Sequence, residues 1–180
     1  PGHILIYKDK QRSYRDLPVR LGELGTVYRY ERSGTLHGLF RVRGFTQDDA
    51  HIFCRPDQIE DEVVNCLEFA FDVLKAYGFD RYKAEISIWD GGVSGKYVGT
   101  PAQWELAQNA LEKAVTRVGL EATVIPDEAA FYGPKIDVKL LDALDRPWQL
   151  STVQFDFTLP ERFQLEYVGE DGGKHQPLMV

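Results

Sequence analysis

Residues 41–51 read RVRGFTQDDAH, a stretch whose side chains are too varied for one packed core face. In an extended strand, successive side chains point to opposite faces of the sheet. At about 3.3 Å per residue, one face of this strand would order six functional side chains along about 33 Å. The six are Arg41, Arg43, Phe45, Gln47, Asp49 and His51. This row suits an extended substrate, with phosphates near the arginines, a base on the ring and a small polar group at the far end.

The same alternation also fits a solvated strand face with a few ion pairs, so both interpretations stay open. On the preceding extended segment, Arg29 and Glu31 again share a face. A guanidinium suits a phosphate or a carboxylate, and the carboxylate beside it can accept a hydrogen bond from an exocyclic amine. A surface Arg–Glu pair worth under about 1 kcal/mol is the alternative.

Two later segments carry polar side chains within apolar sequence. Residues 131–135 read FYGPK, a turn followed by a strand, and residues 148–154 read WQLSTVQ. Buried polar groups need partners, and either a bound ligand or cross-strand pairing would supply them. His51 is a possible metal ligand, although a lone histidine is more often structural. No Cys or His stands at metal-ligand spacing around it.

The rest of the chain predicts an α+β fold, a mostly antiparallel β-sheet flanked by helices. Extended segments over 17–31 and 39–53 are separated by a glycine-containing turn, so we expect residues 20–53 to form a long hairpin. Apolar side chains at helical spacing predict helices over 58–77 and 100–118. Further strands are expected at 83–89, 121–126, 135–142, 147–157, 164–168 and 177–180.

The composition indicates one domain that can bury a core, with 180 residues, 43% hydrophobic and 27% charged. A net charge of −7 argues against broad, non-specific binding to nucleic acid, which needs clustered Lys and Arg. Two cysteines do not make a disulfide framework. Neither a membrane-spanning run nor a signal-peptide pattern is found, so we expect a cytoplasmic protein. The missing initiator Met and a last residue within an expected strand suggest an excised piece.

Several stretches taken together resemble the class II aminoacyl-tRNA synthetases. Residues 29–34 (RYERSG) through 41–45 (RVRGF) resemble motif 2 of that class, and residues 46–53 (TQDDAHIF) resemble its form in threonyl-tRNA synthetases. The resemblance spans the chain and implies that residues 1–180 are part of a catalytic domain, with the motif 2 region at 20–53. Similar to the threonyl enzymes are also PGH at 1–3, AFYGPK at 130–135, WQ at 148–149, TVQ at 152–154 and YVGED at 167–171.

The resemblance implies a role for each matching position. Arg29 would bind the α-phosphate of ATP and the carboxylate of the amino acid. Glu31 would accept a hydrogen bond from the adenine amine, and Arg41 would hold the outer phosphates. Phe45 would stack under adenine, a contact worth about 1–3 kcal/mol. Lys135 would lie close to the reacting carbonyl, so Arg29 and Lys135 are the candidate catalytic residues.

Further contacts follow from the same resemblance. Gln149 and Thr152 would lie near the nucleotide, which binds with Mg²⁺. The loop over 32–38 would meet the acceptor end of tRNA(Thr). The threonine pocket would be lined by Gln47, Asp49, Tyr132 and Gln154.

In the threonyl family a Zn²⁺ ion binds threonine through its amino and hydroxyl groups, with Asp49 helping to hold the hydroxyl. His51 matches one zinc ligand, and a Cys just before Pro1 and a His just after Val180 would complete the site. Motif 1, which makes the homodimer, would lie outside residues 1–180. Motif 3 and the editing and anticodon-binding domains would lie outside as well. We therefore expect the isolated piece to be inactive.

Two other interpretations remain. A related class II synthetase or paralogue for another amino acid, such as proline or serine, would also carry motif 2, although residues 47–51 and the segment around Tyr132 argue against it. A non-catalytic nucleotide- or RNA-binding module would use the same strand face without chemistry.

Overall fold

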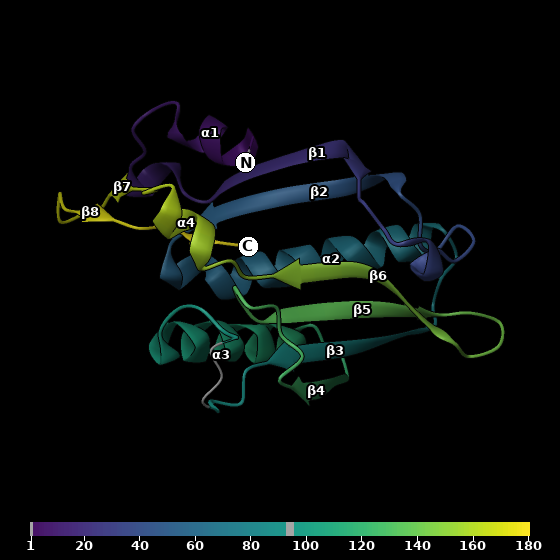
Figure 1. The fold of residues 1–180 in the computed structure, drawn as a ribbon. Coiled ribbons are helices and arrows are strands. Elements are labelled where there is room, and N and C mark those ends of the chain that lie inside the picture. Colours follow the sequence, from purple (N-terminus) through teal and green to yellow (C-terminus); the bar gives the residue numbers. More distant parts are fainter. Residues whose placement is uncertain (1, 93–95) are drawn as a thin grey trace.

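The computed structural model describes residues 2–92 and 96–180, which form two main sheets with helices behind them (Figure 1). The first sheet is the predicted hairpin, β1 (Val19–Tyr28) and β2 (Gly44–Cys54), joined at its far edge by β9 (Leu178–Met179). The hairpin is antiparallel, with Val19 opposite Phe53 and Tyr28 opposite Gly44. This register fixes which residues of the motif 2 region share a face.

The second sheet has the strand order β4-β3-β5-β6. Its central pairs, β3 with β5 and β5 with β6, are antiparallel, as expected. β3 and β4 are parallel, because the helix α3 lies between them in sequence and carries the chain back to the start of the sheet. The strands are β3 (Tyr82–Ile88), β4 (Ala122–Pro126), β5 (Lys135–Leu141) and β6 (Pro147–Gln154).

Both predicted long helices form, as α2 (Ile59–Ala76) and α3 (Pro101–Arg117). At the start of α3, the Thr100 hydroxyl accepts a hydrogen bond from the backbone amide of Gln103, and the Gln103 side chain accepts one from the backbone amide of Thr100. This capping box satisfies two otherwise free amide groups. Gly78 and Gly119 follow the two helices with φ of 80° and 68°, a left-handed conformation that glycine adopts without strain.

A buried core lies between the helices and the second sheet. α2 contacts α3 and also touches both β2 and β6, so it runs behind the boundary between the two sheets (Figure 1). The Glu62 carboxylate of α2, only 3% exposed, accepts two hydrogen bonds of 2.6 Å from Arg20 of β1 and ties helix to hairpin. The largest fully buried side chains of this core are Trp104, Phe155, Leu67, Leu111, Ile136, Val63 and Val138.

A second, smaller core joins the two ends of the described chain. The helix α1 (Gly2–Lys8) buries Ile4 and Tyr7 against Phe53 of β2 and Met179 of β9. Around it lie α4 (Thr158–Arg162) and the short pair β7 (Tyr167–Val168) and β8 (Lys174–His175).

Several element boundaries differ from the sequence expectation. The strand expected over 39–53 begins only at Gly44, because the backbone amides of Phe40 and Arg41 both donate to the His37 carbonyl, at 2.9 and 3.2 Å, and form a turn. The strand expected over 147–157 ends at Gln154, and α4 follows, an element that the sequence analysis does not predict. Asp156 starts this helix by accepting hydrogen bonds from two backbone amides, at 2.7 and 2.9 Å.

Among the described residues, no helix has the length and apolar character that crossing a membrane would require.

Gly133 supplies the first prediction, because a Cβ at this position would collide with the backbone carbonyl of Phe155. At Gly34, in the hairpin connection, no atom lies within 4 Å of an added Cβ. We expect Gly133→Ala to lower the free energy of unfolding by about 1–3 kcal/mol, and Gly34→Ala to change it by less than about 0.5 kcal/mol. Urea unfolding of both variants measures the difference, and equal stabilities would contradict this close approach of the two backbone segments.

Candidate active site

Along β2 the predicted alternation of side chains is present from Gly44 to His51. Phe45, Gln47, Asp49 and His51 are each partly buried, while the residues between them are exposed. Arg41 and Arg43 precede the strand, so strand alternation does not decide where they point. The Nε atom of Arg43 donates to the carbonyl of Glu31 at 3.0 Å.

At one end of this row, the structure brings together four of the six residues expected to meet ATP. One cavity is lined by Arg29, Glu31, Arg41 and Phe45, together with Leu39, Phe40 and Val42. The Arg29 guanidinium lies 5.2 Å from the centre of the Phe45 ring, and Arg41 Nε lies 3.6 Å from a carboxylate oxygen of Glu31. The cavity therefore offers two cations, one carboxylate acceptor and two aromatic rings, Phe40 and Phe45.

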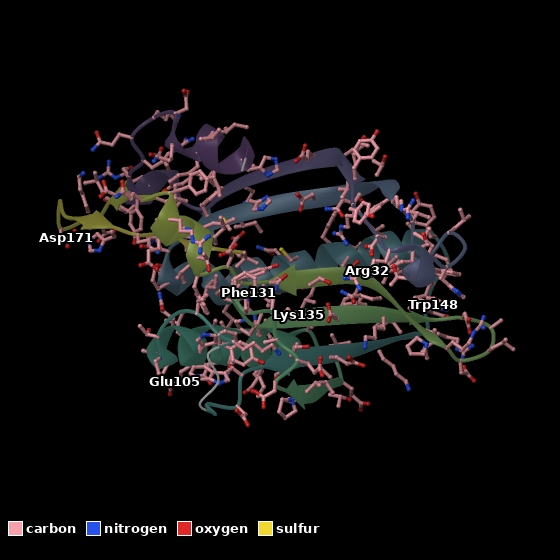
Figure 2. All side chains as sticks on the ribbon, in the orientation of Figure 1. Arg32, Glu105, Phe131, Lys135, Trp148 and Asp171 are labelled. Carbon is pink, nitrogen blue, oxygen red and sulfur yellow. The ribbon has the colours of Figure 1, made fainter. Side chains whose placement is uncertain are left out.

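The connection between the hairpin strands is held by an aromatic stack that the sequence analysis does not predict. The ring of Phe40 stacks on Trp148 of β6, with centroids 3.9 Å apart and planes 15° apart, and His37 stacks on the same indole at 5.7 Å. Figure 2 shows Trp148 and Arg32 toward the same end of the molecule. Because Phe40 also lines the cavity, the stack fixes one of its walls.

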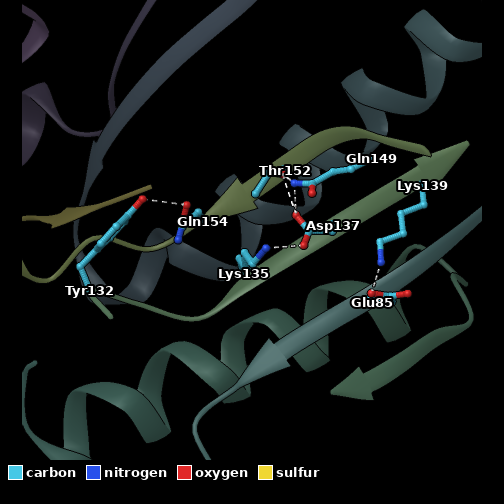
Figure 3. Close-up of polar contacts among 8 residues, drawn as sticks. All are labelled: Glu85, Tyr132, Lys135, Asp137, Lys139, Gln149, Thr152 and Gln154. Carbon is cyan, nitrogen blue, oxygen red and sulfur yellow. Dashed lines mark hydrogen bonds and ion pairs between the residues drawn. The ribbon is translucent and has the colours of Figure 1, made fainter. Parts of the chain in front are cut away.

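On the second sheet, the polar residues expected near ATP converge on Asp137 of β5 (Figure 3). Its carboxylate accepts hydrogen bonds from Lys135 Nζ at 2.5 Å, Gln149 Nε2 at 2.8 Å and Thr152 Oγ1 at 2.7 Å. Asp137 is not among the site residues predicted from the sequence. Its place two residues after Lys135, between the apolar Ile136 and Val138, is the alternation that indicates it.

Two expected threonine contacts meet at the end of β6. The Tyr132 hydroxyl donates to Gln154 Oε1 at 3.3 Å (Figure 3). Within the described part of the chain, the buried Gln154 Nε2 has no hydrogen-bond partner, and neither has Thr158 Oγ1. A buried amide donor without a partner is costly, so this position suits a ligand with an acceptor.

Charged groups from other parts of the fold shift the pKa of Tyr132 at this end of β6. Burial raises the pKa of Tyr132, the Asp156 carboxylate raises it further, and the Arg29 guanidinium lowers it. Asp156 is a second residue that the sequence analysis misses. Its charge also raises the pKa of His51, although burial, the largest effect there, lowers it. Arg29, Tyr132, Asp156 and His51 therefore share one electrostatic environment.

His51 ends the row beside a second imidazole. Its Nδ1 lies 2.9 Å from His3 Nδ1, and a proton shared there leaves His51 Nε2 for another partner. Burial lowers the pKa of His51 and so favours the neutral imidazole, the form that binds a metal ion. Residues 2–92 and 96–180 contain no group of three His, Cys, Asp or Glu that could hold a metal ion. His51 therefore fits as one zinc ligand, but these residues do not complete a zinc site.

All of residues 1–180 match the tRNA synthetase class II core domain (G, H, P, S and T), and the chain belongs to this family. Curated relatives that it matches include threonine–tRNA ligases. The protein with this name in Acidobacterium capsulatum is 66% identical over 180 residues, which are 100% of this chain and 26% of the relative. The chain thus spans about a quarter of the curated relatives' length, and the expected threonyl branch of the class is confirmed.

Solved structures agree with this assignment. The fold matches the crystal structure of the RNA binding domain of threonyl-tRNA synthetase from Cryptosporidium parvum Iowa II, with a TM-score of 0.87 and 44% identity over 99% of this chain and 44% of that one. The putative threonyl-tRNA synthetase ThrRS-1 from Aeropyrum pernix also matches with a TM-score of 0.87, at 36% identity over 99% of this chain and 42% of that one. The expected α+β class is therefore confirmed.

The aromatic stack on Trp148 generates a prediction about the hairpin connection. Stacked rings contribute about 0.5–1.5 kcal/mol beyond their buried area, so Phe40→Ala should speed hydrogen exchange of the backbone amides over 36–43. Leu39→Ala is the control, because Leu39 is 93% exposed. Mass spectrometry of exchange measures both variants, and equal exchange rates would rule out the stack as the restraint.

Proposed function

We propose that this chain is part of the catalytic core of a threonine–tRNA ligase. In this proposal, the full-length protein activates threonine with ATP to threonyl-adenylate and transfers the threonyl group to tRNA(Thr). The order of side chains along the hairpin carries the proposal, from the cavity at Arg29 and Phe45 to the polar end at Asp49 and His51. The similarity to threonine–tRNA ligases along the whole chain supports it.

The hairpin cavity would hold ATP with its Mg²⁺. Phe45 provides the face for adenine and Glu31 the acceptor for its amine, while Arg41 reaches the outer phosphates. The Arg29 guanidinium, already over the Phe45 ring, would contact the α-phosphate and the carboxylate of the amino acid. An arginine fork can hold both of these anions through charged hydrogen bonds.

The amino acid would lie between the hairpin and the end of β6, against Gln47, Asp49, Tyr132 and Gln154. A site that bonds the threonine hydroxyl rejects valine, which lacks it, by roughly 10⁴–10⁵-fold. Serine differs by one methyl group, worth only about 1–3 kcal/mol, so its rejection needs a separate editing step. The donor of Gln154 that lacks a partner in the described chain supports a polar ligand here.

The reaction would be attack of the threonine carboxylate on the α-phosphorus of ATP, which forms the acyl–phosphate bond and releases pyrophosphate. This chain contributes position and charge rather than a nucleophile. Arg29 stabilises charge at the α-phosphate, and the Lys135 ammonium, held at 2.5 Å from Asp137, would stabilise charge near the reacting carbonyl.

The remaining parts of this proposal concern the full-length protein. His51 would be one ligand of a Zn²⁺ that helps to bind threonine, and the other ligands would lie outside residues 1–180. Motifs 1 and 3 and the anticodon-binding domain would also lie outside, with residues 20–53 as motif 2. We further propose a cytoplasmic homodimer whose loop over 32–38 meets the tRNA acceptor end.

Threonine-dependent exchange of pyrophosphate into ATP by the full-length protein tests the proposal. We expect Arg29→Gln to lower the exchange rate by about 100-fold or more, because it removes a charged donor at the α-phosphate. Arg32→Gln is the matched control, since Arg32 is outside the cavity and exchange needs no tRNA. Exchange with another amino acid but not threonine would favour a related synthetase, and nucleotide binding without exchange would favour a binding module.

The zinc proposal has its own test in the full-length protein. His51→Ala should lower both the bound zinc, measured by elemental analysis, and the affinity for threonine. His37→Ala is the control and should leave the bound zinc unchanged, because His37 lies in the hairpin connection, where it stacks on Trp148. Unchanged metal content in His51→Ala would defeat the assignment.

A further inference from the structure

We propose that Asp137 is a positioning residue of this active site, which sets the Lys135 ammonium, the Gln149 amide and the Thr152 hydroxyl in place before substrates bind. The inference deepens the proposed function and rests on it for the identity of the substrates. The Asp137 carboxylate occupies a position where a β-sheet ordinarily carries an apolar or a solvated side chain.

Asp137 is 4% exposed, in the middle of β5 and between β3 and β6. Its neighbours Ile136 and Val138 point to the opposite face and pack in the core, at 0% and 1% exposed. Burying a carboxylate costs free energy unless charges or hydrogen-bond donors compensate it. Three side-chain donors compensate the buried Asp137 carboxylate.

Both carboxylate oxygens of Asp137 are used. Oδ2 accepts from Lys135 Nζ at 2.5 Å, and Oδ1 accepts from Thr152 Oγ1 at 2.7 Å and from Gln149 Nε2 at 2.8 Å. Gln149 Nε2 also lies 2.8 Å from Thr152 Oγ1, which closes a triangle with the carboxylate (Figure 3). One anion therefore joins three side chains from two strands, and all three are expected at the nucleotide or the reacting carbonyl.

This network decides what each side chain can offer a substrate. A carboxylate only accepts, so it turns the Gln149 amide with Nε2 inward, where both N–H groups are used. Among the described residues, Gln149 Oε1 then has no hydrogen-bond partner. The Thr152 hydroxyl donates its proton to Asp137 and keeps a lone pair that can accept. Lys135 donates one of its three N–H groups to Asp137, and among the described residues the other two have no partner. Gln149 and Thr152 are thus set to accept from hydroxyl or amine groups of a nucleoside, and Lys135 to donate to an anionic oxygen.

The same sheet face contains a matched control. Glu85 of β3 stands directly opposite Asp137 in register, and its carboxylate pairs with Lys139 (Figure 3). The Lys135 and Lys139 side chains are similarly exposed, at 20% and 25%. In the described chain, Glu85 makes no hydrogen bond to Lys135, Gln149 or Thr152. Removing its charge therefore measures the effect of losing a carboxylate from this sheet face without disturbing the Asp137 network.

The experiment compares Asp137→Asn with Glu85→Gln in the full-length protein, by pyrophosphate exchange with ATP and threonine varied separately. We expect Asp137→Asn to lower kcat/KM for ATP by about 100-fold, the cost of a misplacement near 1 Å. KM for threonine should stay unchanged, because the Asp137 carboxylate contacts none of the expected threonine-binding residues. Glu85→Gln should leave all these constants unchanged. Equal losses in both variants, or a rise of KM for threonine as large as the rise of KM for ATP, would overturn the proposal.

A second measurement tests the role of Asp137 without an assay of the proposed activity. The rates at which Lys135 and Lys139 react with acetic anhydride, read by mass spectrometry, report how firmly each ammonium is held. Lys135 should react faster in Asp137→Asn alone, and Lys139 faster in Glu85→Gln alone. If the wild-type protein shows no threonine-dependent exchange, the proposed function fails, while unchanged Lys135 labelling in Asp137→Asn would overturn the positioning role.

Should Asp137→Asn fail to fold, Asp137→Glu takes its place. It keeps the charge but moves the carboxylate by one methylene, so the selective loss for ATP and the faster labelling of Lys135 are again expected. Wild-type kinetics together with wild-type labelling in Asp137→Glu would overturn the proposal.

Discussion

The antiparallel pairing of β1 with β2 is the constraint on which the rest of the site depends. Strand alternation puts Phe45, Gln47, Asp49 and His51 on one face of β2, and the register, with Tyr28 opposite Gly44 and Val19 opposite Phe53, decides which residues of β1 stand beside them. A slip by one residue would turn this row to the other side of the sheet. The buried pair of Arg20 and Glu62 joins the same hairpin to α2, so the row keeps its place relative to the second sheet.

The two faces of the second sheet differ in chemistry. Its inner side carries the apolar residues of the main core, and its outer side carries the network around Asp137. Tyr132 and Gln154 lie where β6 ends, and the effects of Arg29 and Asp156 on the pKa of Tyr132 reflect their closeness to it. Substrate recognition would thus use two faces, each fixed by its own strand pairing.

Much of this arrangement can be predicted from the sequence, because it rests on local patterns. Alternation predicts the row from Phe45 to His51, and helical spacing with glycine stops predicts α2 and α3. The site assignments, in contrast, come from resemblance to the class II synthetases and stay proposals. Local patterns fail where tertiary contacts decide, as at the turn on the His37 carbonyl and the start of α4 at Asp156. The stack of Phe40 on Trp148 is missed because its two rings are distant in sequence. Local alternation marks Asp137, but its contacts with Gln149 and Thr152 on the next strand are not visible in that pattern.

The smaller core has a consequence for the order in which the chain can fold. It is built from Ile4 and Tyr7 near one end and from Leu165, Tyr167 and Met179 near the other, with Phe53 between them. During synthesis, residues near position 4 leave the ribosome long before position 179 exists, so this cluster cannot close until the late residues emerge. Contacts so distant in sequence form slowly. The end of the hairpin that carries His51, next to Phe53, therefore gains its final packing only after the residues around Met179 have emerged.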